Sequence, residues 1–212
     1  MAASTPPRAP RPAGKPTIAR IRAAARQVFY DKGFFPASVE EIAAHAGVSR
    51  ATVYLYYRSK DEMLLDLMRQ DLAYQLEIYA ELVTLKRVSL AGVRKWLVRL
   101  RGEQDERRNS LNLFWAGANL QTNALDPVYR HHDNIIATLG RRFPGFDLGS
   151  QARGEREALR TRCYMMLFMI EGTTVQINEG GPGPSVKAAL DQLARTLVHF
   201  LDHGEVMTSP PG

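Results

Sequence analysis

Hydrophobic residues recur every three or four positions along most of the chain, and no stretch alternates as a half-buried β-strand does. Such spacing gives each segment one apolar face, which is typical of helices that pack on a shared core. The pattern predicts an all-α fold. The expected helices run from Thr17 to Gly33, as two short helices after Phe35, from Ser59 to about Leu82, and near residues 89–103, 107–122, 127–142, 155–179 and 186–203.

The two short helices have clear start and stop signals. Ser38 precedes Glu41 by three residues, which is a capping box at the start of the first helix. Gly47 is expected to end this helix, because glycine adopts the left-handed backbone conformation at little cost. Ser49 is a suitable N-cap for the second helix. Two short helices joined by a glycine turn predict a helix-turn-helix.

A third start signal opens the long helix. Ser59 and Glu62 repeat the capping-box spacing, and apolar residues at helical spacing continue well past them. This helix is too long to belong to a small helix-turn-helix module alone. It is therefore expected to connect that module to the rest of the chain.

The run SVEEIAAHAGVSRATVYLYYRSKDEML closely resembles the DNA-binding motif of the TetR (tetracycline-repressor-like) family of bacterial transcriptional regulators, and IRAAARQVFYDKGFFPAS resembles that family's first helix. The resemblance covers roughly residues 17–66. It implies an N-terminal three-helix helix-turn-helix domain and a C-terminal helical domain for effector binding and dimerisation. We expect a disordered basic arm over 1–16, the DNA-binding domain over 17–64, the second domain over 65–205 and a flexible tail over 206–212.

Charge is distributed unevenly along the chain. Residues 1–60 carry 10 Lys and Arg against 3 Asp and Glu, a net charge of +7, whereas the other 152 residues have a net charge of −1. A basic module on a near-neutral body suits binding to nucleic-acid phosphates. The partner expected from this charge and from the motif is a double-stranded DNA operator.

Several residues of the motif are candidates for DNA contact. A helix in the major groove presents its outer side chains to phosphates and base edges. The resemblance assigns backbone contacts to Thr52, Tyr54 and the helix starts near Ser38 and Lys60, and Lys60 is placed to neutralise a phosphate. Leu55 departs from the family pattern, which often has histidine there. The full set of candidates is Ser38, Ser49, Arg50, Thr52, Tyr54, Tyr56 and Lys60.

The second half of the chain contains two strongly apolar helical segments. Residues 163–177 are apolar almost all round, and the last helix has a stripe that includes Leu193 and Leu197. Helices with these positions form the dimer interface in TetR-like proteins. We therefore expect a homodimer through 161–179 and 186–203, with ordinary core packing as the alternative for one face of each helix.

Large adaptable side chains in the second domain suggest a small-molecule site. Apolar walls with a few polar groups are typical of ligand pockets, and the family keeps an effector pocket here. The expected effector is largely hydrophobic or aromatic. Plain core packing is the alternative for each of the candidates, which are Trp96, Asn112, Trp115, Asn119, Met166 and Met169.

Other chemistry finds little support in the sequence. No catalytic motif is present, no cofactor is implied, and the histidines do not provide the three or four converging ligands of a zinc site. No apolar run reaches membrane-spanning length and no signal-peptide pattern is present, so a cytoplasmic protein is expected. The expected function is a homodimeric repressor of a pseudo-palindromic operator that its effector releases. The alternatives are an activator or protein-recruiting regulator of the same fold, and a helical enzyme or small-molecule-binding protein with an incidental basic head.

Overall fold

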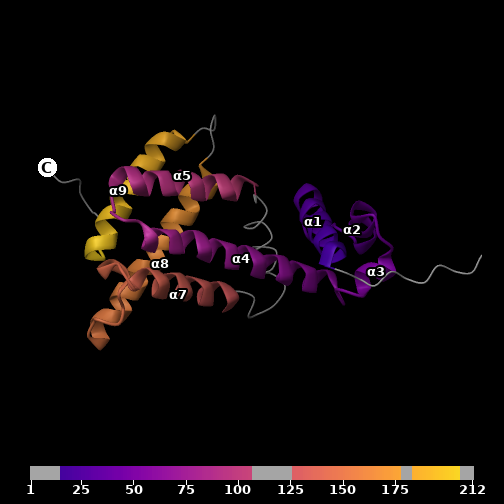
Figure 1. Cartoon of the computed structure of the whole chain (residues 1–212), viewed down its shortest axis with the longest axis horizontal. Helices are drawn as coiled ribbons and strands as arrows, with labels where there is room; N and C mark the ends of the chain where they lie inside the picture. The colour runs from indigo at the N-terminus through magenta and orange to yellow at the C-terminus, as the bar shows by residue number, and fades with distance from the viewer. Residues whose placement is uncertain (1–14, 107–125, 178–182, 206–212) are drawn as a thin grey trace, which may run out of the picture.

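The computed structural model describes residues 15–106, 126–177 and 183–205, and every regular element in these ranges is helical (Figure 1). This result confirms the predicted all-α fold. The elements are α1 (Lys15–Lys32), α2 (Val39–Ala46), α3 (Arg50–Tyr54), α4 (Lys60–Thr84), α5 (Leu90–Glu106), α7 (Asp126–Gly140), the 3-10 turn η1 (Pro144–Phe146), α8 (Arg153–Gln176) and α9 (Val186–His203). The helix expected near 107–122 lies outside the described residues.

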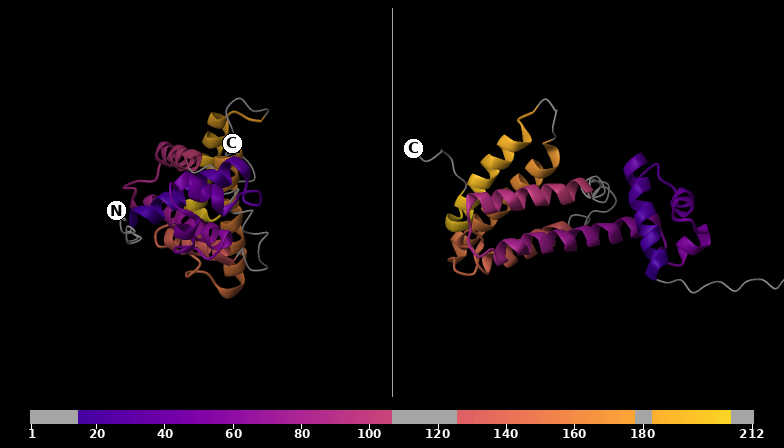
Figure 2. Two further views of the ribbon diagram at one scale, coloured as in Figure 1. Left: turned by 90° about the vertical axis from the view of Figure 1, so that its right-hand side faces the viewer. Right: turned by 45° about the horizontal axis from the view of Figure 1, so that its top comes forward.

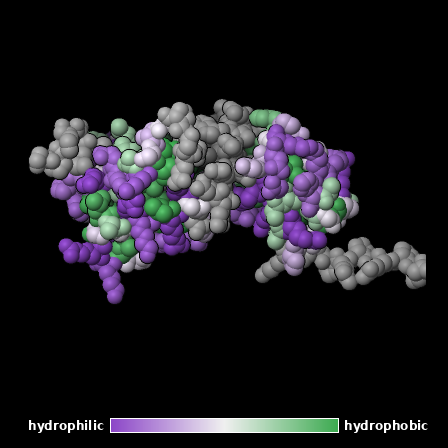
Figure 3. All heavy atoms as spheres, turned by 90° about the horizontal axis from the view of Figure 1, so that it is seen from above, coloured by the Kyte–Doolittle hydropathy of each residue, from purple (hydrophilic) through white to green (hydrophobic). Residues whose placement is uncertain are grey.

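The described helices form two hydrophobic cores. The first core joins α1, α2 and α3 to the first turns of α4, and its central side chains include Ile21, Ile42, Val53 and Leu64. We call this part of the molecule the head. The second core, in what we call the body, joins the far end of α4 to α5, α7, α8 and α9. Figure 3 shows the two parts as separate lobes with mainly hydrophilic surfaces.

Helix α4 belongs to both parts. It leaves the head beside α1 and continues between α5 and α7 in the body (Figure 2). Met63, Leu64, Leu67 and Met68 are buried in the head core, whereas the next fully buried apolar side chain is Ile78 in the body core. The intervening turns of α4, residues 69–77, contain no hydrophobic side chain that is fully buried.

Two details of the helix starts differ from the expectation. The side chain of Ser59 accepts a hydrogen bond from the Glu62 amide, but the Glu62 carboxylate accepts from the Arg58 amide instead of completing a capping box. Helix α1 begins at Lys15, two residues before the expected start at Thr17.

One face of the last helix, α9, packs in the body core of the same chain. Leu193 and Leu197 are buried among side chains of the body core, with 3% and 0% of their surfaces exposed. Helix α9 also packs closely on η1, where a Cβ added at Gly145 would lie 1.7 Å from the carbonyl oxygen of Phe200. This stripe of α9 therefore packs within the chain, which is the alternative of ordinary core packing for one face of the helix, because η1, α5 and α8 already cover it.

Candidate DNA-binding surface and ligand pocket

The start of α2 is fixed by the predicted capping box. The Ser38 hydroxyl accepts a hydrogen bond from the Glu41 amide at 3.2 Å, and the Glu41 carboxylate accepts from the Ser38 amide at 3.0 Å. Lys32 also donates to this carboxylate, and the two partners together lower the pKa of Glu41 to about 2. The Ser38 hydroxyl is thus used to hold the helix start in place.

The turn between α2 and α3 follows the sequence signals. Gly47 adopts a left-handed conformation with φ of 62°, and its amide bonds back to the end of α2. The Ser49 hydroxyl accepts from the Thr52 amide at 3.0 Å and shares a further hydrogen bond of 2.8 Å with the Thr52 hydroxyl. These contacts set the direction of α3 relative to α2.

One side of α3 is open to solvent. Tyr54 is 42% exposed and Leu55 is 75% exposed, whereas Val53 is buried in the head core. The Arg50 guanidinium donates to the Tyr54 hydroxyl at 3.2 Å and forms an ion pair with Glu40 at 2.7 Å. Arg50 and Tyr54 therefore form a polar pair on the outer side of α3. Glu40 of α2 joins this pair through its ion pair with the Arg50 guanidinium. Tyr56 is half-buried at the edge of the head core.

Lys60 has different contacts from those expected. Its ammonium donates to the carbonyl oxygens of Phe34, Phe35 and Ala37 at 2.7, 3.0 and 2.8 Å. It also lies 4.5 Å from the centre of the Phe34 ring. An ammonium has three N–H donors, and here each has a backbone acceptor. The side chain therefore joins the start of α4 to the turn between α1 and α2, and none of its donors is left for a phosphate.

Arg58 is a candidate that the sequence analysis missed. Its side chain is exposed in the turn between α3 and α4, and within the described ranges it forms no ion pair. The residue lies two positions before Lys60, on the same basic turn. The sequence has two basic residues in this turn, Arg58 and Lys60. The resemblance to the TetR motif assigned a DNA contact to Lys60 and none to Arg58.

Two sets of charged contacts attach α1 to α4. Arg22 donates to the Asp66 carboxylate at 2.8 Å, and the Tyr57 hydroxyl donates to the same carboxylate at 2.5 Å. Burial and the neighbouring Asp66 raise the pKa of Tyr57 to about 12, so its proton remains in place at neutral pH. One turn further along each helix, Arg26 pairs with Asp71 at 2.7 Å.

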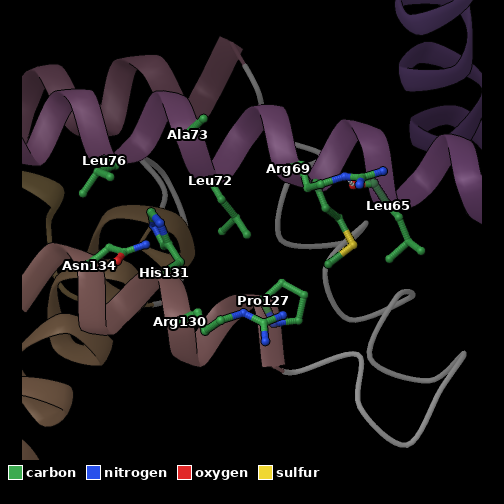
Figure 4. A pocket seen from close by; sticks show the side chains of 10 residues that line it. Leu65, Arg69, Leu72, Ala73, Leu76, Pro127, Arg130, His131 and Asn134 are labelled. Atoms are coloured by element: carbon green, nitrogen blue, oxygen red, sulfur yellow. Dashed lines mark hydrogen bonds between the residues drawn. The ribbon is translucent and has the colours of Figure 1, made fainter.

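A pocket of about 560 Å³ lies between α4 and α7 (Figure 4). Its volume is in the range of small-molecule sites. Leu72 points from α4 into the space between the helices, and His131 points from α7 toward α4. The lining residues are mainly apolar and comprise Leu65, Met68, Arg69, Leu72, Ala73, Leu76, Pro127, Arg130, His131 and Asn134.

None of the three expected effector residues that the structure describes lines this pocket. Trp96 and Met166 are buried in the body core, and the Trp96 indole N–H donates to the Ile78 carbonyl at 2.9 Å. Met169 is partly exposed on α8. Asn112, Trp115 and Asn119 lie outside the described residues. The sequence analysis missed the pocket residues on α4, because their spacing is that of any connecting helix.

Buried polar groups lie beside the pocket. His131 Nε2 bonds to the Gln75 side chain at 2.8 Å, and burial together with the neighbouring His132 lowers the pKa of His131 to about 4. His132 Nε2 bonds to Glu171 of α8 at 2.9 Å, while His132 Nδ1 and the Tyr79 hydroxyl have no hydrogen-bond partner among the described residues. Among the described residues, no group of three or more His, Cys, Asp or Glu side chains is placed to hold a metal ion.

Helix α8 has an exposed apolar side. Met165, Phe168 and Met169 are 55%, 52% and 37% exposed, whereas Cys163, Met166 and Ile170 on its other side are fully buried. The exposed side chains lie one turn apart and so form one stripe along the helix. Within the described parts of the chain, no helix is long and apolar enough to cross a membrane.

Comparisons with known proteins match the head most closely. The family described as "Bacterial regulatory proteins, tetR family" matches residues 21–67. The Fatty acid metabolism regulator protein of Bacillus subtilis is 32% identical over 63 residues, which are 30% of this chain and 32% of that protein. The HTH-type transcriptional regulator EthR of Mycolicibacterium smegmatis is 41% identical over 61 residues, which are 29% of this chain and 28% of that protein. The match therefore spans about a third of each of these relatives.

The whole fold has relatives among solved structures. Salmonella enterica GusR superposes with a TM-score of 0.66 at 20% sequence identity, covering 88% of this chain and 95% of that one. At this identity the likeness concerns the fold alone. The head thus carries, over residues 21–67, the helix-turn-helix domain of the TetR family of bacterial regulatory proteins, and the chain as a whole shares its fold with GusR.

Proposed function

We propose that the protein is a homodimeric repressor that binds a pseudo-palindromic DNA operator through α3 and releases it when a largely apolar small molecule occupies the pocket between α4 and α7. The observation that carries the DNA-binding part is the exposed side of α3, where Arg50 and Tyr54 project from a helix whose start is fixed by Ser49. A short helix held in this way and open to solvent suits the major groove.

The apolar stripe of α8 supports the homodimer. Exposed apolar side chains in a row mark association surfaces more often than isolated ones do. A second copy of the chain would cover Met165, Phe168 and Met169, which no described part of the chain covers. A dimer is also needed to present two recognition helices about 34 Å apart, one turn of DNA.

The position of the pocket supports control by a ligand. Leu65, Arg69 and Leu72 line the pocket on one side of α4, while Asp66 and Asp71 on another side hold α1 of the head. A ligand that shifts these turns of α4 must also move the attachment of the head. Coupling between two such sites is typically about 1–3 kcal/mol, enough to change operator affinity fivefold or more.

Retention of genomic DNA fragments on the purified full-length protein tests the DNA-binding proposal. We expect sequence-selective retention that weakens steeply with salt. Tyr54→Phe removes one hydroxyl from the exposed side of α3 and is expected to weaken binding to the selected fragments roughly threefold to tenfold. Tyr30→Phe, at a tyrosine of α1 that is 49% exposed, is the matched control. Equal retention of all fragments at physiological salt would contradict the proposal.

A further inference from the structure

Among the described residues that line the α4–α7 pocket, the charged side chains are all positive. Two arginines line it, Arg69 from α4 and Arg130 from α7, together with the neutral side chain of Asn134. No Asp or Glu is among the described residues that line the pocket. In Figure 4 both arginines lie toward the end marked by Leu65 and Pro127, whereas Leu76 and Asn134 mark the other end.

The acidic residues of this part of α4 are used elsewhere. Asp66 and Asp71 bind Arg22 and Arg26 of α1, on the side of α4 that faces the head. The Arg69 Nε donates to the carbonyl of Leu65 in its own helix, and neither Arg69 nor Arg130 forms an ion pair within the described ranges. Asp66 attracts Arg69 through space without forming an ion pair with it, so these residues balance only part of the positive charge at this end of the pocket.

His131 does not add a third positive charge at neutral pH. Its Nε2 is bonded to Gln75, and burial beside His132 lowers its pKa to about 4. The remaining lining side chains, among them Leu72 and Leu76, are apolar. The pocket thus has a cationic end with two guanidiniums and a mainly apolar remainder that includes the neutral side chains of His131 and Asn134.

We propose that this pocket binds an amphipathic anion, a molecule with a carboxylate or phosphate group and an apolar body. The anionic group pairs with Arg69 and Arg130, because guanidinium groups form strong charge-assisted hydrogen bonds with such oxygens. The apolar body lies along Leu72 and Leu76, where burial removes its surface from water. The inference rests on the proposed function of the pocket as the effector site and names the class of its ligand.

Three probes that differ only in the charge of the head group test the proposal. Sodium decanoate, 1-decanol and decyltrimethylammonium are titrated separately into the full-length protein below their aggregation limits and followed by calorimetry. Decanoate is expected to bind more tightly than decanol, and decanol more tightly than the cation. Equal or tighter binding of the cation, or failure of all three probes to bind, would overturn the proposal.

Variants at the arginines locate the anionic group. Arg69→Gln and Arg130→Gln are each expected to weaken decanoate binding roughly threefold to tenfold, with a larger effect at low salt, and to leave decanol binding unchanged. Arg87→Gln removes the same charge from an exposed arginine in the loop after α4, outside the pocket, and is expected to leave both affinities unchanged. Circular dichroism spectra confirm that each variant is folded. Equal decanoate affinity in all the proteins would place the anionic group elsewhere and contradict the proposal.

A separate measurement distinguishes this inference from the proposed function. Operator release is measured with decanoate at saturating concentration as set by calorimetry. Head-group preference without operator release supports the ligand class and contradicts the effector mechanism. Operator release by the neutral and cationic probes as readily as by decanoate supports the mechanism and contradicts the ligand class.

Discussion

At the scale of single residues, Lys60 binds backbone carbonyls instead of being free for the phosphate contact that the resemblance implies, and we expect Arg58 to make that contact. Lys60→Ala would leave the carbonyls of Phe34 and Ala37 without their donor, and we expect the head to lose roughly 1–3 kcal/mol of unfolding free energy. Arg58→Gln should leave stability unchanged, because the side chain is exposed and has no ion-pair partner in the described ranges. It should instead reduce the salt dependence of DNA binding by about one unit of slope.

Chemical denaturation and salt titrations of DNA binding check this pair of variants. The opposite pattern, a stable Lys60→Ala protein with a reduced salt slope, would mean that the ammonium leaves its carbonyls for a phosphate. Lys60→Arg serves as a second variant, since it keeps the charge but changes the geometry of the three donors.

His131 gives the body a dependence on pH. Its pKa falls from the ordinary 6.5 to about 4 in the folded protein, so the unfolded chain binds the proton first as the solution is acidified. Its contribution to stability is present above pH 6.5 and is lost as the pH falls toward 4, by about 2–3 kcal/mol. His131→Gln should remove this part of the pH dependence.

Thermal unfolding between pH 7 and pH 4 checks the contribution of His131. Carboxylates also titrate in this window, so the informative quantity is the difference between the variant and the unaltered protein. His45→Gln replaces an exposed histidine of the head and is the control for the loss of an imidazole outside the body. Identical profiles for His131→Gln and the unaltered protein would contradict the prediction.

At the scale of elements, local signals were predicted well and tertiary contacts were not. The cap at Ser38, the turn at Gly47 and the cap at Ser49 each depend on neighbours within a few residues, and all three were predicted from the sequence. The partners of Lys60 lie 23 to 26 residues away, so helix periodicity could not reveal them.

The burial of Leu193 is a second case in which helix periodicity could not identify the partner of a side chain. An apolar stripe indicates that a helix face is covered, but it does not say whether the covering side chains come from the same chain. The pocket between α4 and α7 also depends on two groups of lining residues, 65–76 and 127–134, that lie far apart in sequence. The head and the fold class were therefore predictable, whereas the pocket and the free face of α8 required the structure.

The attachment of α1 to α4 can be tested through Asp71. The carboxylate is 9% exposed and pairs with Arg26, so Asp71→Asn leaves a partly buried guanidinium without its charge partner. We expect a loss of about 2 kcal/mol in the unfolding free energy of the head. Glu77→Gln, at an exposed acidic position of the same helix, should change stability by less than about 0.5 kcal/mol. Equal effects of the two variants in denaturant titrations would show that the pair contributes nothing specific.

At the scale of the whole molecule, the dimer should depend on the exposed stripe of α8. Phe168→Glu places a charge in the centre of that stripe, where the ring is 52% exposed and its inner edge contacts His132 and Tyr164. We expect a folded monomer with much weaker operator binding. Val98→Glu, at a valine of α5 that is 47% exposed, is the control and should remain dimeric. Light scattering at micromolar concentration checks both variants, and a Phe168→Glu protein that stays dimeric would place the interface elsewhere.

Helix α4 runs without a break from the head core to the body core. It therefore also fixes how far the head is rotated about the helix axis relative to the body. Each residue of an α-helix turns the chain by about 100° and advances it by about 1.5 Å. One residue inserted between Asp71 and Leu72 would therefore swing α3 to a different side of the molecule, although the side chains of both cores would keep their neighbours. A head transplanted from another protein would point correctly only if its α4 joined at the same helical register. The number of residues in this helix thus specifies the direction in which the protein faces DNA.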